Sequence, residues 1–238
     1  MSRARDLANL GNNATGLETL TVSDITDITA TADEINLVDG SVSGPLSNRN
    51  MIINGAMQIW QRSTDVTCYD GSNETYNSVD RWSPNFNGGS PGTLRISRST
   101  DTPDNFGYSQ KLKCDGTGTP TSSNQMAHWR TKIEAQDLQH LNYGSSSARV
   151  MTLSWYMKSV NYTSPLSFYF IKYDNTTAYY VKSVTPTTSW ARYSLTIPAN
   201  TNSGHGIDND NGLGLETGIM LSGTSGGLYE QTGDSTAW

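Results

Sequence analysis

Two serine-containing stretches near the end of the chain have the spacing of hydrolase motifs. Gly223-Thr224-Ser225-Gly226-Gly227 matches the nucleophile elbow, and Gly233-Asp234-Ser235 matches another hydrolase signature. A nucleophile elbow exposes its serine on a sharp turn between a parallel strand and a helix. The residues around both stretches predict neither element, so we interpret them as serine-glycine turns and predict that the protein is not an enzyme.

Candidate metal ligands are few. The three histidines, His128, His140 and His205, lack the spacing of a zinc site or a catalytic triad. Asp208-Asn209-Asp210-Asn211-Gly212 gathers the hard oxygens that calcium prefers, but its glycine stands in the wrong place for an EF-hand loop. Asp208 and Asp210 are the candidate calcium ligands, an Asx-rich turn is the alternative, and no cofactor is expected.

A sugar-binding surface needs aromatic rings on a rigid β-surface next to amide or hydroxyl groups. Tyr169, Tyr173 and Tyr179 flank a turn that contains Asn175, and these four residues are the candidate glycan contact. The alternative is that the tyrosines pack at a protein interface or cover the sheet. Cleavage of a glycan would need two convergent carboxylates, and the sequence lacks the repeats of a parallel β-helix.

The composition restricts the class of protein. Only 16% of the residues are charged, whereas the chain contains 22 Gly, 12 Tyr and 6 Trp. Aromatic and uncharged polar side chains suit β-surfaces and turns, so an all-β fold is expected. The formal net charge of -6 comes without clusters of Lys and Arg, which argues against nucleic acid as a partner. Apolar runs of about 18 residues are missing, so neither a signal peptide nor membrane insertion is predicted.

Alternating apolar and polar residues predict a series of strands after residue 92. They cover residues 93–97, 108–114, 126–133, 150–158, 166–173, 178–184, 190–198 and 215–222. Residues 134–141 can form a brief helical turn, and residues 63–92 are rich in loop-forming residues. Short strands with regular turn signals favour an antiparallel β-sandwich of two sheets.

The alternation also assigns side chains to faces. Trp129 is expected to point into the core, which puts His128 on the solvated face of the same strand. In residues 150–158 we expect the face with Met151 and Met157 to be buried, and Tyr156 lies on the other face. Cys68 and Cys114 are expected to be free thiols, with a disulfide between them as the alternative.

Residues 12–47 carry too few large apolar side chains to order themselves. The ones present are Leu17, Leu20, Val22, Ile25, Ile28, Ile35, Leu37 and Val38. Either this arm is disordered, or copies of the chain intertwine around a threefold axis and these residues form the trimer interface. Thr31 and Glu34 have the spacing of a capping box and predict one short helix within the arm.

Residues 48–62, the hinge run, separate this arm from the strands. Their apolar residues form a dense patch of Met51, Ile53, Ala56, Met57, Ile59 and Trp60. Asn54-Gly55 tolerates the positive φ of a tight turn, and we interpret the run as the start of a domain that covers residues 48–238. Trp82 is expected to cover one end of this domain, fixed by an interaction of Arg81 with Asp80 or with the backbone.

Several stretches resemble proteins of tailed bacteriophages. NRNMIINGAMQIWQRST at residues 48–64, followed by Asp80-Arg81-Trp82, resembles the opening of a domain found in tail-fibre and other virion proteins. TATADEINLVDG at residues 29–40 resembles an element that recurs in fibres of marine and cyanobacterial phages. SWYMKS, the hairpin after it and TTSWARYSLTIP, within residues 154–198, resemble galactose-binding-like jelly rolls, the architecture of many carbohydrate-binding modules.

These resemblances imply a structural protein of the virion, assembled in the host cytoplasm. We expect a homotrimeric tail fibre whose jelly roll contacts host surface glycans during adsorption. Residues 1–11 would dock on a tail or adaptor protein of the virion through Arg3, Arg5, Leu7 and Leu10.

Two alternatives remain at this point. The first is a head fibre or capsid decoration protein, and the second is a secreted carbohydrate-binding or glycan-cleaving protein. Residues 234–238 read like the start of another strand. We therefore expect the jelly roll to continue beyond them or to be completed by another chain.

Overall fold

Alternating side chains organise the chain into antiparallel sheets. The computed structural model describes residues 50–68, 75–87, 92–116, 126–223 and 235–236. The strands are β1 (Asp65–Cys68), β2 (Trp82–Asn87), β3 (Leu94–Ser99), β4 (Ser109–Cys114), β5 (Met126–Glu134), β6 (Met151–Met157), β7 (Leu166–Lys172), β8 (Ala178–Val184), β9 (Ala191–Ile197), β10 (Leu213–Gly223) and β11 (Ser235–Thr236). The helical segments are η3 (Ala135–Leu141) and η4 (Ser203–His205).

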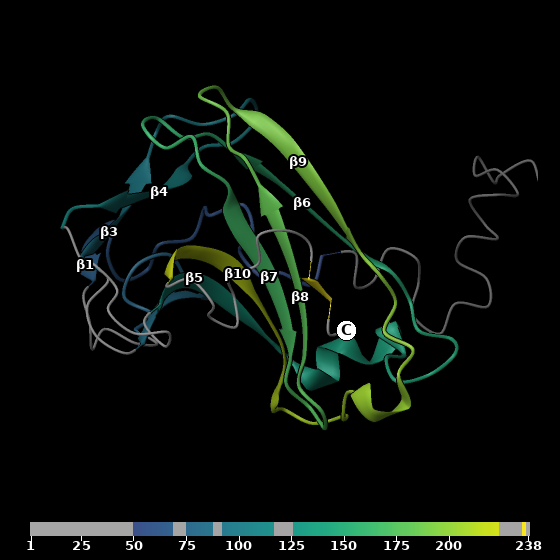
Figure 1. Cartoon of the computed structure of the whole chain (residues 1–238). Helices are drawn as coiled ribbons and strands as arrows, with labels where there is room; N and C mark the ends of the chain where they lie inside the picture. The colour runs from purple at the N-terminus through teal and green to yellow at the C-terminus, as the bar shows by residue number, and fades with distance from the viewer. Residues whose placement is uncertain (1–49, 69–74, 88–91, 117–125, 224–234, 237–238) are drawn as a thin grey trace, which may run out of the picture. The chain divides into compact units, whose positions relative to one another are not determined.

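The strands form three sheets, and every described strand pair is antiparallel. A 6-stranded sheet has the order β11-β8-β7-β10-β5-β2, a 3-stranded sheet has the order β1-β3-β4, and β6 pairs with β9. Figure 1 shows β8, β7 and β10 side by side in the largest sheet. The predicted all-β, antiparallel class is confirmed.

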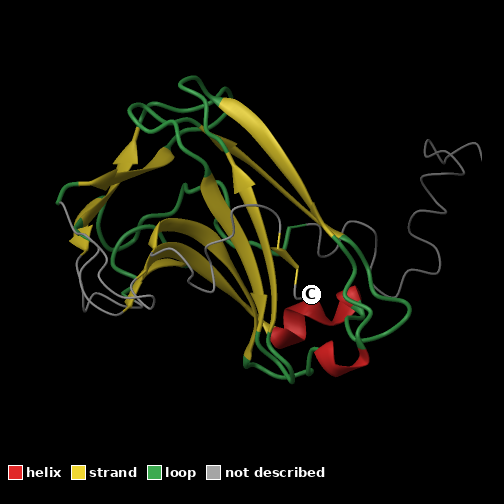
Figure 2. Ribbon diagram, in the orientation of Figure 1, coloured by secondary structure: helices red, strands yellow, loops and turns green. Residues whose placement is uncertain are grey.

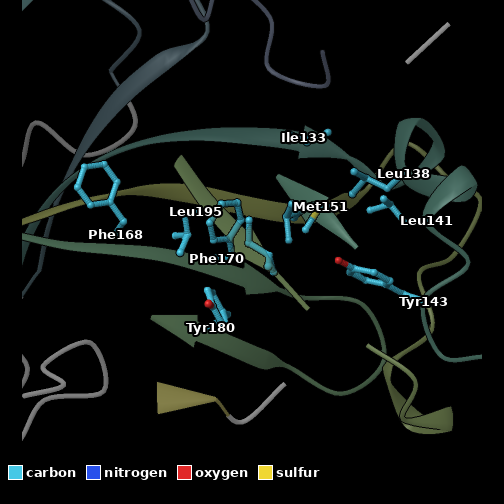
Figure 3. Packing of buried hydrophobic residues seen from close by; sticks show 11 residues of the cluster. Ile133, Leu138, Leu141, Tyr143, Met151, Phe168, Phe170, Tyr180 and Leu195 are labelled. Atoms are coloured by element: carbon cyan, nitrogen blue, oxygen red, sulfur yellow. The ribbon is translucent and has the colours of Figure 1, made fainter. Parts of the chain in front are cut away.

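The large sheet packs against both smaller sheets. One cluster joins Phe168 and Phe170 of β7 to Met151 of β6 and Leu195 of β9, and Figure 3 shows it extending to η3 at Leu138. A second cluster joins β2 and β5 to β1 and β3. It is made of Cys68, Val79, Trp82, Phe86, Leu94, Ile96, Ala127 and Trp129. The sequence predicts two sheets, whereas the described strands form three, and both smaller sheets pack against the large one.

Both helical segments lie at one end of the large sheet (Figure 2). η3 is a turn of 3-10 helix that buries Ala135, Leu138 and Leu141, which confirms the helical turn predicted for residues 134–141. Within the described ranges, no helix combines the length and the apolar character needed to cross a membrane.

Two strands lie in the stretch that the sequence predicts to be loop-rich. β1 pairs with β3, and β2 forms the edge of the large sheet beside β5. β2 contains Pro84, which lacks the backbone N–H of a central strand and is tolerated at an edge. A proline and three polar residues in WSPNFN hide this strand from an alternation pattern.

The two cysteines are free thiols. Cys68 of β1 and Cys114 of β4 face Leu94 from opposite sides of β3. Their backbones are therefore two strand spacings apart, about 10 Å, and a disulfide requires about 7 Å or less between Cα atoms. Burial raises the pKa of the Cys68 thiol to about 11, which keeps it protonated and unreactive at neutral pH.

Candidate functional site

Asn54 organises the hinge run. Its backbone has a φ of 55°, as the predicted turn requires, and its carbonyl accepts a hydrogen bond from the Met57 N–H at 3.0 Å. The side-chain oxygen accepts from the N–H groups of Gln58 and Ile59. The side-chain nitrogen donates to the carbonyls of Ile59 and Asp80, at 3.0 Å in each case. One amide therefore closes the turn and fastens it to a residue 26 positions later.

Asp80 makes three further hydrogen bonds to the hinge run. Its N–H donates to the Ile59 carbonyl at 3.1 Å, and its carboxylate accepts from the Gln61 N–H at 2.8 Å and from the Arg62 guanidinium at 3.0 Å. Residues 51–62 and Asp80-Arg81-Trp82 thus form one hydrogen-bonded unit, which we call the hinge joint.

Arg81 connects the hinge joint to the large sheet. Its backbone has a φ of 72°, and its guanidinium donates to both carboxylate oxygens of Glu134, at 3.0 Å each. The predicted partner was Asp80 or the backbone, so the side-chain partner is corrected to Glu134. Trp82 is buried and stacks on Trp129 with ring centroids 6.4 Å apart and planes at 10°.

Apolar side chains of the hinge run divide between the core and the surface. Ile52 packs against both core clusters, and Met57 and Trp60 pack against the second. Ile53 and Ile59 point away from these clusters and are 53% and 51% exposed. The hinge run therefore presents two apolar side chains on a backbone that hydrogen bonds hold in place.

Replacing Asn54 with alanine is expected to lower the free energy of unfolding by about 2–3 kcal/mol. The variant loses the amide's hydrogen bonds, each worth roughly 1 kcal/mol or less at a half-exposed site, and holds alanine at positive φ. Asn54→Gly removes the amide but tolerates the backbone, so its loss should be smaller by about 1 kcal/mol.

Urea unfolding of the two variants measures these losses. Asn105→Ala is the matched control, because Asn105 also has positive φ, at 69°, and its substitution reports the backbone cost. If Asn54→Ala lowers the free energy of unfolding no more than Asn105→Ala does, the hydrogen bonds of the Asn54 side chain do not stabilise the hinge joint.

A buried chain of polar side chains crosses four strands of the large sheet, on the face opposite the core clusters. The Arg130 guanidinium donates to Glu216 at 2.8 Å, and the Tyr169 hydroxyl donates to the other Glu216 oxygen at 3.0 Å. The His128 Nδ1 lies 2.8 Å from that hydroxyl, and Asn85 Nδ2 lies 3.1 Å from His128 Nε2. Because all but Asn85 are buried, we call this set the buried chain.

The directions of its hydrogen bonds follow from Glu216. A carboxylate only accepts, so Tyr169 uses its proton there and its oxygen accepts from the Nδ1–H of His128. The Nε2 of His128 is then the acceptor for the Asn85 amide. His128 is therefore a neutral imidazole with the proton on Nδ1, and the one negative charge of the set is balanced by Arg130.

His128 was predicted to be solvated, and the structure corrects this. It does lie on the face opposite Trp129, but it is only 2% exposed. Burial first, and then the charge of Arg130, lower the pKa of His128 to about 3. An imidazole with this pKa stays neutral across the pH range in which histidines act as acid-base catalysts.

The low pKa of His128 predicts a loss of stability in mild acid. In the unfolded chain a histidine takes up a proton near pH 6.5, whereas the folded protein binds it only near pH 3. Folding stability should therefore be intact above pH 6.5 and fall by up to about 1.4 kcal/mol per pH unit below it. Urea titrations between pH 7 and pH 4.5 measure this slope.

His128→Gln should flatten the slope, whereas His140→Gln should keep it. A small residual slope is expected in the His128 variant, because desolvation also lowers the pKa of His205. An equal slope in wild type and His128→Gln would show that another group controls the acid response.

The predicted tyrosine platform is only partly on the surface. Tyr169, Tyr173 and Tyr179 do gather in one cluster, opposite Phe168 and Phe170, as the alternation predicts. Tyr169 is 0% exposed and bonded within the buried chain, which removes its ring from the candidate glycan contact. Asn175 has a φ of 53° and donates its amide to the Gly206 carbonyl at 3.0 Å.

The carboxylates of the loop at residues 208–212 accept hydrogen bonds from the backbone and from a side chain. Asp208 accepts from Asn175 at 3.3 Å, and Asp210 accepts from the Gly212 N–H at 2.9 Å. Close by, the buried ammonium of Lys172 donates to the carbonyls of Asp174 and Gly206. In the parts of the chain that are described, no group of three His, Cys, Asp or Glu side chains is arranged for a metal ion. Asp210 thus makes the Asx-type contact of the alternative prediction, whereas Asp208 binds a side chain of the β7–β8 turn.

A shallow cavity of 220 Å³ lies at the helical end of the sheet. It is lined by Leu138, Gln139, Asn142, Tyr143, Ser145 and Ile207. Gln139 fixes its wall, because the amide donates to the carbonyls of Ala135 and Asp208 at 2.9 Å. The lining carries no ionised side chain, so the cavity offers hydrogen bonding without charge.

Several predicted sites lie outside the described residues. These are the docking residues Arg3, Arg5, Leu7 and Leu10, the trimer residues Leu17, Leu20, Val22, Ile25, Ile28, Ile35, Leu37 and Val38, and Ser225 of the serine-glycine stretch. Comparison of the chain with family models, with curated proteins and with solved structures finds no match.

Proposed function

We propose that the chain is a non-enzymatic structural protein of a tailed-phage virion, a homotrimeric tail fibre attached through its N-terminus. The hinge joint is the observation that carries this proposal. The two stretches that resemble the opening of a virion-fibre domain lie on different parts of the sequence, and Asn54 binds one to the other. A rigid joint directly after a core-poor arm suits a collar from which a domain projects.

The arrangement of the sheets supports a jelly roll of the carbohydrate-binding type. The large sheet faces two smaller ones, and every strand pair among the described residues is antiparallel. Ser235–Thr236 adds β11 to the edge of the large sheet beside β8, where the sequence predicts that a further strand starts.

The trimer would begin in the arm and extend to the hinge joint. Residues 12–47 would intertwine through their apolar side chains, and residues 1–11 would bind the tail or an adaptor protein. Ile53 and Ile59 support this arrangement, because each exposes half of an apolar side chain next to the point where three arms would meet. Burying them against sister copies would remove that surface from water.

Immunogold microscopy of purified virions tests the proposal. An antibody raised against residues 51–223 should label the distal parts of the tail fibres, and treatment that strips the fibres should remove the label. Label on the head would indicate a head fibre or decoration protein instead. A structural role would be contradicted if the virions carried no label and the protein were found free in the culture medium.

A further inference from the structure

Exposed apolar side chains concentrate on one short segment of the domain. Of the seven large ones in the described residues, Tyr156, Val160 and Tyr162 fall within seven residues and are 44%, 71% and 46% exposed. They lie on β6 and on the loop that joins it to β7. Figure 1 shows this loop gathered with the β3–β4 and β8–β9 loops at one end of the sheets, away from η3.

Hydrogen bonds hold the loop of Tyr162 in place. The Tyr162 N–H donates to the Ser159 hydroxyl at 3.2 Å, and its own hydroxyl donates to the Pro165 carbonyl at 3.3 Å. The Ser159 N–H in turn donates to the Thr187 carbonyl of the β8–β9 loop at 2.8 Å. Because the hydroxyl is bonded back to its own loop, Tyr162 offers solvent the surface of its ring.

Tyr156 is fixed from two sides. Its ring packs edge-on against Phe106 of the β3–β4 loop, with centroids 5.6 Å apart and planes at 61°. On the neighbouring strand its cross-strand partner is Arg192, whose guanidinium donates to the Ser154 hydroxyl at 3.2 Å. A rigid exposed ring therefore stands beside a cation.

Asp101, Lys158 and Trp190 link the same three loops through side-chain contacts. The Trp190 indole N–H donates to Asp101 at 2.9 Å, and the Lys158 ammonium binds the same carboxylate. That ammonium also lies 5.4 Å from the centre of the Trp190 ring. These contacts tie together the loops that carry Phe106, Tyr162 and Thr187, and the charges of Lys158 and Asp101 are paired.

We propose that Tyr156, Val160 and Tyr162, with Lys158, Trp190 and Arg192 around them, form a binding surface for neutral hexopyranose chains. The C–H face of a sugar ring stacks on a fixed aromatic ring, and its hydroxyl groups bond to the polar groups beside that ring. This inference rests on the proposed function, since it names the surface with which the fibre would contact host glycans. It is separate from the predicted β7–β8 platform, of which one residue, Tyr169, is buried.

The size of the surface favours a sugar over a second copy of the chain. An aromatic side chain has about 150–250 Å² of surface, so the aromatic part of this surface, Tyr156 and Tyr162 at nearly half exposure each, amounts to roughly 200 Å². A stable protein interface takes about 800 Å² from each partner. One or two sugar rings fit the smaller area, and weak contacts of this size add up over three copies of a fibre.

Saturation-transfer NMR of the full chain tests the proposal with three probes, cellohexaose, laminarihexaose and mannohexaose. At least one should receive magnetisation from the protein, and the double variant Tyr156→Ala/Tyr162→Ala should weaken its binding at least tenfold. Tyr156→Phe/Tyr162→Phe should keep binding within about threefold, because the rings remain. Thermal melting of each variant checks that the fold is intact.

Asn142→Ala, in the cavity at the opposite end of the sheet, is the control and should bind as wild type does. Three results would overturn the proposal: no transfer to any probe, equal binding by the double alanine variant, or a change in subunit number caused by that variant. The last would make the surface a contact between copies. If the antibody labels virions but the protein binds no sugar, only this inference is contradicted. If the protein binds a sugar but the antibody does not label virions, the proposed function is contradicted.

Discussion

Replacing Glu216 with glutamine is expected to lower the free energy of unfolding by about 3–5 kcal/mol. Glutamine has almost the same shape, but it removes the carboxylate charge that pairs with the Arg130 guanidinium at 2.8 Å. The side chains of Arg130 and Glu216 are 7% and 1% exposed, and breaking a buried ion pair by removing one of its charges typically costs several kcal/mol. Urea unfolding at pH 7 measures the loss.

Glu134→Gln is the matched control for this substitution. Glu134 also binds an arginine, Arg81, but those side chains are 36% and 40% exposed, so its loss should cost about 1 kcal/mol or less. The double variant Glu216→Gln/Arg130→Met should be more stable than Glu216→Gln alone, because it also removes the buried positive charge that Glu216 compensates. Equal costs for Glu216→Gln and Glu134→Gln would refute the buried chain as a stabilising unit.

Replacing Gly218 with alanine is the second large effect we expect, a loss of at least about 3 kcal/mol. Gly218 of β10 lies opposite Arg130 on one neighbouring strand and opposite Tyr169 on the other. A Cβ atom at this position would lie 2.2 Å from the Trp129 carbonyl oxygen and 2.9 Å from the Arg130 Cα. Both are backbone atoms of a central strand, so the clash cannot be relieved by a side-chain rotation.

Gly204→Ala provides the comparison, since its Cβ would have no neighbour closer than 3.6 Å. It should change the free energy of unfolding by less than about 1 kcal/mol. We further expect Gly218→Ala to weaken the pairing of β5 with β10, which would appear as faster amide exchange in those strands. A stable Gly218→Ala protein with wild-type exchange would mean that the two strands are further apart than described.

Strands with a clear alternation were predictable, and the others were not. Residues 150–158 place Met151 and Met157 toward the core, and the structure confirms this for the β6 face. The same alternation put Tyr156 on the outer face, where it is exposed. β2 was missed because Pro84 and its polar neighbours give no period of two.

Alternation predicts the face of a side chain but not what covers that face. His128 and Tyr169 were correctly separated from Trp129 and Phe168, yet both are buried. Tyr169 bonds to Glu216 and His128 bonds to Tyr169, and these residues come together only when β5, β10 and β7 are paired. The sequence pattern places these polar residues on one face of their strands but does not indicate that their side chains hydrogen-bond to one another.

The hinge joint was half predictable. Asn54-Gly55 indicates a turn, and Asn54 does adopt positive φ. Its bond to Asp80 could not be derived from composition or periodicity, because it joins two loops rather than two strands. The resemblance named both stretches, and the structure supplies the physical reason that they occur together.

The mass of the intact chain in solution tests the central claim most directly. Light scattering on the native protein, free of virions, should give three times the mass of one chain, and removal of residues 1–47 should reduce that number. If the truncated chain stays fully trimeric, the trimer interface lies in residues 48–238 instead of the arm. A single-chain mass for the intact protein at micromolar concentration would contradict the fibre.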